Sequence, residues 1–145
     1  MNDVPNHNTA YYYIKHNVLE HEYAMHKHIY HLGIVNTPKI IAYDRETKVM
    51  VMEKINFMNL SDFYGEDAKN ISSKLFVKIK AIIKTLYINN IVYPDITGYN
   101  FVEYDDKIWI LDFEHADFRP HLQDAFVEQF IADKPLKQKW NPRFK

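Results

Sequence analysis

Cysteine is absent from this 145-residue sequence. Its absence excludes a disulfide framework and any thiolate metal site. A surplus of basic charge is absent as well, because 18 Lys and Arg residues stand against 19 Asp and Glu residues and give a net charge of −1. Bulk binding of nucleic acid depends on a strongly basic face. We therefore expect no nucleic-acid partner.

Long apolar runs are also missing. No stretch of the sequence reaches the length of a helix that spans a bilayer. Residues 1–5 lack the basic and apolar regions of a signal peptide. We therefore expect no membrane association and a cytoplasmic, intracellular location.

Glycine is scarce, with three residues in the whole sequence and none ahead of Tyr11. A glycine-rich phosphate-binding loop uses glycines so that the backbone can approach the phosphates closely. The sequence therefore argues against such a loop.

Apolar and aromatic residues are plentiful instead. They make up 47% and 15% of the sequence, and 11 tyrosines and nine phenylalanines are among them. Each large ring buries roughly 150–250 Å². A chain of this length can form one compact domain with its own core, so we expect a single domain over residues 1–145.

Hydrophobic periodicity predicts a mixed order of strands and helices. Strands are predicted at residues 10–15, 40–43 and 49–53, and as a hairpin at residues 100–104 and 107–111. Helices are predicted at residues 18–32, 71–89 and 122–132, with a short one from residue 60. This order is not a regular βαβ alternation. It predicts an α+β fold with a small sheet-bearing part at about 10–55, a helical part at about 56–134 and an irregular tail at 135–145.

Three polar residues stand where rigid scaffolds present functional side chains. Asp95 and Asn100 lie five residues apart in a polar loop that leads into an apolar strand, and Asp112 ends the next strand. Mg²⁺ prefers hard oxygen ligands, usually one or two carboxylates together with phosphates. Phosphoryl transfer also needs a carboxylate that orients the attacking hydroxyl. Asn100 and Asp112 could hold the metal, and Asp95 could serve the hydroxyl.

The same residues resemble the protein-kinase-like family, including its choline-kinase and aminoglycoside-kinase branches. The family's catalytic loop has an Asp followed five residues later by an Asn, as Asp95 and Asn100 are. Its metal-binding Asp stands in an Asp-Phe-Gly triplet after a hairpin, and residues 112–114 here read Asp-Phe-Glu. The resemblance implies that Asp95 is the catalytic base and that Asn100 and Asp112 are Mg²⁺ ligands.

Upstream residues fall in the order of the same family. Residues 51–55 resemble the strand and hinge where adenine binds to backbone, which implies that Glu53 and Ile55 contact ATP. Glu22 stands where the family has its helix-borne glutamate, and Lys15 resembles the strand lysine that pairs with it and touches the phosphates. The resemblance runs from about Tyr11 to about residue 117. It implies a kinase-like fold with a reduced N-terminal sheet lobe, a short helical C-terminal lobe, and ATP and Mg²⁺ as cofactors.

The sequence also departs from the family pattern. Tyr93 and Pro94 replace the usual His-Arg, Thr97 replaces a common lysine, and no Ala-Pro-Glu triplet follows. The acceptor hydroxyl could belong to a protein serine or threonine or to a small alcohol. A pseudokinase that binds nucleotide or protein without turnover is the main alternative. An oligomer or a partner that completes the open N-terminal lobe is also compatible with the sequence.

A Mg²⁺-dependent nuclease is a minor alternative. Residues 94–95 and 105–107 match a Pro-Asp…Asp-x-Lys pattern. That pattern requires its Asp-x-Lys on a central strand, whereas Asp105, Asp106 and Lys107 fall at the turn of the predicted hairpin. The nuclease interpretation also leaves Asp112 without a role.

The sequence assigns no definite role to two further groups of residues. Four histidines crowd the helix predicted at 18–32, and we expect them to be solvated: His21, His26, His28 and His31. The basic tail from residue 134 carries Trp140 and Phe144, and it could contact an acidic partner or pack as a strap on the fold.

A composition rich in Ile, Lys, Asn and Tyr suggests AT-rich coding, as in a large DNA virus or a low-GC microbe.

Overall fold

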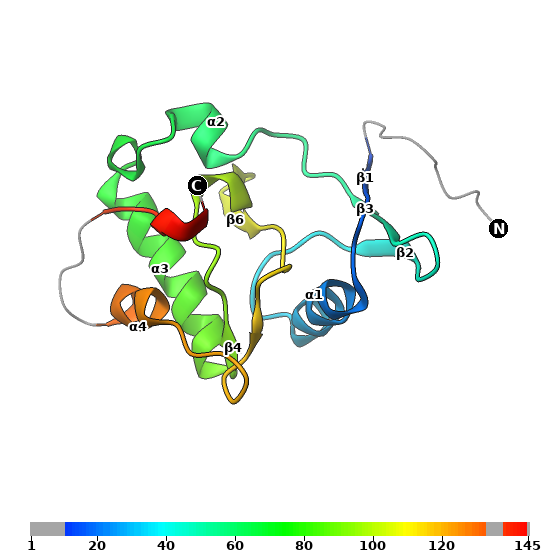
Figure 1. Cartoon of the computed structure of the whole chain (residues 1–145). Coiled ribbons are helices and arrows are strands. Elements are labelled where there is room, and N and C mark those ends of the chain that lie inside the picture. The colour runs from blue at the N-terminus through cyan, green and yellow to red at the C-terminus, as the bar shows by residue number, and fades with distance from the viewer. Residues whose placement is uncertain (1–10, 133–137, 145) are drawn as a thin grey trace.

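The computed structural model describes residues 11–132 and 138–144. Figure 1 shows a small sheet with helix α1 beside it and a larger helical part, linked by the connector that follows β3. The sheet has the order β1-β3-β2, and both pairings are antiparallel. Its strands are β1 (Tyr12–Lys15), β2 (Ile40–Asp44) and β3 (Val49–Glu53).

Helix α1 (Glu20–Leu32) lies beside this sheet (Figure 1), and its Met25 and Ile29 join the hydrophobic core of the helical part. Its buried residues lie at i, i+3, i+4 and i+7, the spacing of one helical face, and are Glu22, Met25, His26 and Ile29. Gly33 ends the helix in the left-handed conformation with φ of 65°, which glycine adopts without a Cβ clash. Leu32, three residues after Ile29 in the last turn, is exposed.

The helical part is built around helix α3 (Ser73–Ile88), which buries Leu75, Phe76, Ile79, Ile83 and Leu86. Ser72 starts it by accepting a hydrogen bond from the Leu75 N–H. The other elements are α2 (Leu60–Tyr64), the 3₁₀ turn Ala68–Asn70, α4 (Ala125–Ile131) and the strand pairs β4 (Ile91–Val92) with β7 (Asp117–Phe118) and β5 (Phe101–Tyr104) with β6 (Lys107–Ile110).

The predicted α+β fold is confirmed, and the boundaries of its elements shift by a few residues. Helix α4 begins later than expected because Asp124 caps it, with its carboxylate accepting the Val127 N–H at 2.9 Å. The hairpin β5–β6 turns at Asp105 and Asp106, and both have positive φ. Asp and Asn adopt that conformation more readily than most residues, so the pair serves as a tight turn.

The loop between α1 and β2 ties the two parts together near the end of β6. Asn36 forms a parallel bridge with Trp109, and its carbonyl accepts the Ile110 N–H at 2.9 Å. The Thr37 hydroxyl donates to the Ile110 carbonyl at 3.0 Å. These bonds fix the strand that leads to Asp112 against the sheet-bearing part.

The described end of the chain, residues 138–144, returns to the middle of the molecule (red in Figure 1). Trp140 and Asn141 are buried, and a 3₁₀ turn follows at Pro142–Phe144. Residues 135–137 and 145 of the predicted tail lie outside the described residues. Within the described ranges, no helix has the length and apolar character needed to cross a membrane.

Candidate functional site

Three charged side chains from distant parts of the sequence meet between the two parts of the fold. Lys15, at the end of β1, places its Nζ 2.5 Å from Glu22 Oε2 on α1 and 3.2 Å from Asp112 Oδ1. Glu22 is buried, whereas Lys15 and Asp112 are partly exposed. The structure therefore brings together three of the residues singled out in the sequence.

The protonation of this cluster follows from its burial and its charges. Burial alone would lower the pKa of Lys15, but the carboxylates of Asp112 and Glu22 outweigh it and hold the pKa above its ordinary value. Burial raises the pKa of Glu22, Lys15 opposes that rise, and the nearby charges of Asp112 and Glu114 add to it. Lys15 thus stays a cation that faces two carboxyl groups.

The backbone at Asp112 is held in an uncommon conformation. Its φ is 59°, in the left-handed region that few non-glycine residues occupy. The buried Tyr93 hydroxyl lies 2.5 Å from the Leu111 carbonyl and 2.8 Å from the Asp112 carbonyl, within hydrogen-bond distance of both. Phe113 is fully buried and contacts the rings of Tyr93 and His26. These contacts fix the direction of the Asp112 side chain.

The loop from Asp95 to Asn100 lies next to this cluster and is buried except for Tyr99. Asn100 Nδ2 donates to the Asp95 carbonyl at 2.9 Å, so the two residues of the predicted pair are joined directly. His115 Nδ1 lies 3.2 Å from Asp95 Oδ2. Burial raises the pKa of Asp95, the His115 hydrogen bond opposes that rise, and the nearby charge of Asp112 adds to it.

A cleft of about 370 Å³ opens between the sheet and the helical part, and Lys15, Glu22, Asn100 and Asp112 line it. Its apolar walls include Met52 of β3, Val102 of β5 and Leu111, which follows β6. A size of several hundred Å³ suits a nucleotide-sized ligand. A flat base could lie between these apolar residues while its phosphates reach Lys15.

Glu53 and Ile55 lie at the edge of the same cleft. Glu53 Oε1 accepts the Lys39 N–H at 2.8 Å, and the Glu53 N–H donates to the Lys39 carbonyl at 2.9 Å. Lys54 N–H donates to the Tyr11 carbonyl at 2.9 Å. Ile55 N–H has no acceptor among the described residues. The structure thus leaves a backbone donor where the resemblance implies adenine contacts.

The donor atoms at Asn100 and Asp112 fit a hard cation. Asn100 uses its Nδ2 for the Asp95 carbonyl, and its Oδ1 has no hydrogen-bond donor in the part of the chain that is described. Asp112 uses Oδ1 for Lys15 and the Glu114 N–H, and its Oδ2 is likewise without a donor there. Amide and carboxylate oxygens are ligands that Mg²⁺ accepts. A carboxylate oxygen of Glu114 also lies within 4.8 Å of one from Glu22 and one from Asp112.

His26 corrects the expectation that the four histidines of α1 are solvated. Its side chain is buried, and Nε2 lies 2.7 Å from the Pro38 carbonyl. Burial lowers the pKa of His26 to about 4, and the Pro38 carbonyl opposes that shift only in part. The signal was present in the sequence, because residues 22, 25, 26 and 29 share one helical face. The other three histidines are exposed, as expected. His21 also places its Nε2 2.7 Å from the Ala116 carbonyl.

The residues of the nuclease alternative lie apart from this cleft. Asp106 and Lys107 line a separate hollow with residues of α3, and neither lines the cleft that contains Asn100 and Asp112. No described contact joins Asp95 to Asp105, Asp106 or Lys107. The arrangement therefore gives that alternative no common metal site.

Solved structures of low sequence identity share this fold. The kinase PK-1 of Cydia pomonella granulovirus superimposes with a TM-score of 0.55 at 17% identity, over 74% of this chain and 43% of that one. The Rio2 kinase–ADP/Mg²⁺–phosphoaspartate complex from Chaetomium thermophilum gives 0.53 at 17% identity, over 76% and 33%. The fold is therefore protein-kinase-like, as expected from residues 95–114.

Sequence comparison defines the family more closely. Residues 3–123 match the RIO domain family (RIO1), and the chain belongs to that family. It is similar to the EKC/KEOPS complex subunit BUD32 of Enterocytozoon bieneusi (strain H348), with 28% identity over 124 residues, 78% of this chain and 61% of that protein. It is also similar to a probable bifunctional tRNA threonylcarbamoyladenosine biosynthesis protein of Methanosphaera stadtmanae, with 28% identity over 102 residues, 70% of this chain and 19% of that protein. The chain thus spans less than two thirds of either curated relative.

Proposed function

We propose that this chain is an ATP- and Mg²⁺-dependent phosphotransferase that passes the γ-phosphoryl group to a hydroxyl of a protein serine or threonine or of a small alcohol. The observation that carries the proposal is the meeting of Lys15, Glu22 and Asp112 in the cleft that Asn100 also lines. The four residues come from separate parts of the sequence, and a merely structural ion pair would not need the Asn100 loop beside it.

Each residue has a role that follows from its surroundings. Glu22 orients Lys15, whose ammonium then binds phosphate oxygens. Asn100 and Asp112 hold Mg²⁺, which when bound neutralises phosphate charge. Asp95 accepts the proton of the attacking hydroxyl, and Asn100 fixes its backbone through the bond to the Asp95 carbonyl.

The names of the relatives support a role within a protein assembly. BUD32 of Enterocytozoon bieneusi is a subunit of a complex, and the Methanosphaera stadtmanae protein is bifunctional in tRNA threonylcarbamoyladenosine biosynthesis. We propose that a protein partner likewise completes the nucleotide site of this chain.

A pair of matched carboxylate-to-amide variants tests the proposal. ADP formation and transfer from radiolabelled ATP are measured with Mg²⁺, alone and with protein and alcohol acceptors. Asp95→Asn should lower turnover by on the order of 100-fold or more and leave Mg·ATP binding intact, because it removes a base and no phosphate ligand. Asp105→Asn, at the hairpin turn, should leave turnover unchanged. Turnover in Asp95→Asn that equals turnover in the unaltered protein would contradict the assignment of Asp95 as the base.

A pseudokinase remains the second candidate, and Thr97 in place of the lysine that is common two residues after the catalytic Asp favours it. It predicts Mg·ATP binding without ADP formation in the unaltered protein. It also predicts that Asp95→Ala leaves the biological function intact. Turnover that depends on Asp95 would exclude this candidate.

A further inference from the structure

Residues 140–144 reach the loop that carries Asp95 from beyond the part of the chain that matches the RIO domain family, residues 3–123. Asn141 is the centre of this contact and is 1% exposed. Its Nδ2 donates to the Pro94 carbonyl at 2.7 Å, and its backbone N–H donates to the Ile96 carbonyl at 2.8 Å. One residue therefore binds the carbonyls on both sides of Asp95.

The bonds of Asn141 complement those of Asn100. Asn100 holds the carbonyl of Asp95 itself, so the three successive carbonyls from Pro94 to Ile96 are all bound by two asparagines. A loop whose carbonyls are fixed on both faces cannot rotate its peptide planes without breaking several bonds. The direction in which Asp95 projects is thus set by the end of the chain as well as by its own loop.

Two aromatic side chains anchor Asn141 from either side. Trp140 is buried against Phe76 and lies close to Gly98, where an added Cβ would come within 3.2 Å of the indole. Phe144 packs against the ring of His115 with 4.8 Å between centroids, and His115 in turn contacts Asp95. Residues 140–144 therefore act on Asp95 in two places. Asn141 holds the backbone on either side of Asp95, and Phe144 packs against the His115 ring that contacts the Asp95 carboxylate.

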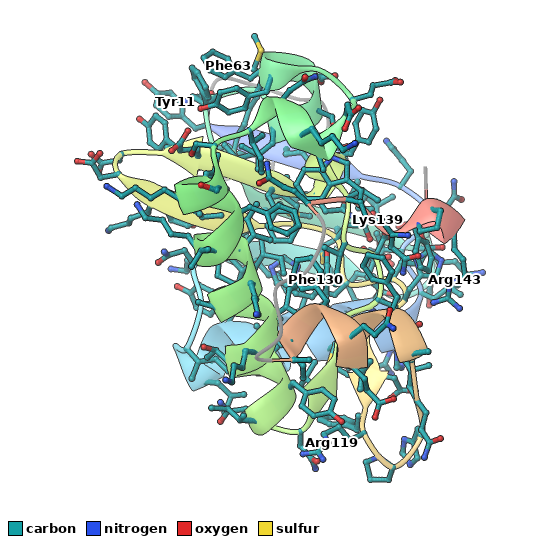
Figure 2. The ribbon with its side chains drawn as sticks, turned by 90° about the vertical axis from the view of Figure 1, so that its left-hand side faces the viewer. Tyr11, Phe63, Arg119, Phe130, Lys139 and Arg143 are labelled. Carbon is teal, nitrogen blue, oxygen red and sulfur yellow. The ribbon has the colours of Figure 1, made fainter. Side chains whose placement is uncertain are left out.

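Charge pairing holds the same segment to α4. Arg143 forms an ion pair with the buried Asp124 carboxylate, which also caps α4, and its guanidinium lies over the Phe144 ring. Figure 2 shows Arg143 on this segment and Lys139 just before it, beside α4. The contacts of residues 140–144 are thus directed at the catalytic loop and at the helix that supports them.

We propose that Asn141 is a positioning residue for Asp95, and that residues 140–144 form a clamp on the catalytic loop. This inference rests on the proposed function. The clamp acts on proton acceptance by Asp95 and not on nucleotide binding, because none of its residues lines the cleft that contains Lys15 and Asp112. It should therefore affect kcat and leave KM for ATP nearly unchanged.

Two alanine variants of the full chain separate positioning from general support. Asn141→Ala removes the bond to the Pro94 carbonyl and keeps the backbone bond to Ile96. Gln138→Ala removes two bonds just before this segment, which Nε2 donates to the carbonyls of Ala68 and Ile71 at 2.8 and 2.6 Å, and it leaves the bonds to the Asp95 loop in place. Each variant thus loses anchoring of the C-terminal segment, and only one loses contact with the catalytic loop.

The measurements are kcat and KM with Mg·ATP, and amide hydrogen exchange over residues 94–100. Asn141→Ala should lower kcat by roughly 10- to 100-fold with KM for ATP within about twofold, since small displacements of a catalytic group have effects of this size. It should also speed exchange in the loop, whereas Gln138→Ala should do neither. Equal effects of the two variants on kcat and on exchange would overturn the proposal.

The exchange measurement keeps the two proposals distinguishable. If the unaltered protein shows no turnover, the proposed function fails, but faster loop exchange in Asn141→Ala alone would still support the clamp. If the unaltered protein turns over ATP and Asn141→Ala matches it in kcat and in exchange, the clamp is wrong and the proposed function stands.

Discussion

The buried imidazole of His26 makes the stability of this fold depend on pH. Its Nε2 lies 2.7 Å from the Pro38 carbonyl, and its ring meets the edge of Phe113 at 5.0 Å between centroids. Burial lowers its pKa from 6.5 to about 4, and the Pro38 carbonyl offsets only part of that shift. The folded protein therefore keeps this ring neutral at pH values where the unfolded chain protonates it.

The sign and size of the effect follow from proton linkage. Between about pH 6.5 and pH 4 the unfolded state binds one proton more than the folded state at this residue, so the free energy of unfolding falls as the pH falls. The gap between the two pKa values corresponds to about 3 kcal/mol at about 1.4 kcal/mol per pH unit. The contribution is complete above pH 6.5 and is lost below pH 4.

Urea unfolding at several pH values between 7.5 and 4 measures this contribution. His26→Gln replaces the ring by an amide that can still donate to Pro38 but does not titrate. The difference in unfolding free energy between the two proteins should shrink by up to about 3 kcal/mol on acidification. His31→Gln, at an exposed position of the same helix, is the control and should follow the unaltered protein. Parallel pH profiles for the unaltered protein and His26→Gln would refute the reasoning.

Two further predictions concern the charged groups of the site. Lys15→Met should destabilise the fold by roughly 1–3 kcal/mol in urea unfolding, because it leaves the buried Glu22 carboxyl without its cation. The double variant Lys15→Met/Glu22→Gln should recover much of this loss. A double variant no more stable than Lys15→Met would contradict the pairing. His115→Ala should shift the acid limb of kcat/KM to higher pH, because Asp95 must be ionised to act as a base and loses the hydrogen bond that opposes its raised pKa. An acid limb that stays in place or moves to lower pH would show that His115 does not act on Asp95.

Much of the fold could be predicted because the apolar periodicity is regular where the elements are long. The helix predicted at 71–89 is α3 within two residues at each end, and the strand predicted at 49–53 coincides with β3. The predicted start of α4 was wrong because a single cap at Asp124, and not the apolar pattern, sets it. Short helices depend on such local hydrogen bonds more than on periodicity.

The candidate site was predictable in part because its residues lie at strand ends and in a short loop. Asp95, Asn100 and Asp112 were found from that local context, and Lys15 and Glu22 only from the resemblance. The positioning role that we propose for Asn141 had no local signal, because its contacts with Pro94 and Ile96 span more than 40 residues of sequence. A buried His26 was missed because a histidine on a helix is usually exposed, although its place on the buried face could have been read from the spacing.

The central claim, that the cleft binds Mg·ATP through Asp112, is tested most directly by thermal unfolding with ATP, with and without Mg²⁺. A ligand that binds only the folded state at about 100 times its Kd adds about 2.7 kcal/mol, which for a chain of this size raises the midpoint by roughly 5–10 °C. The account predicts a rise that requires Mg²⁺ and is lost in Asp112→Ala. No shift at millimolar Mg·ATP, or an equal shift in Asp112→Ala, would contradict it.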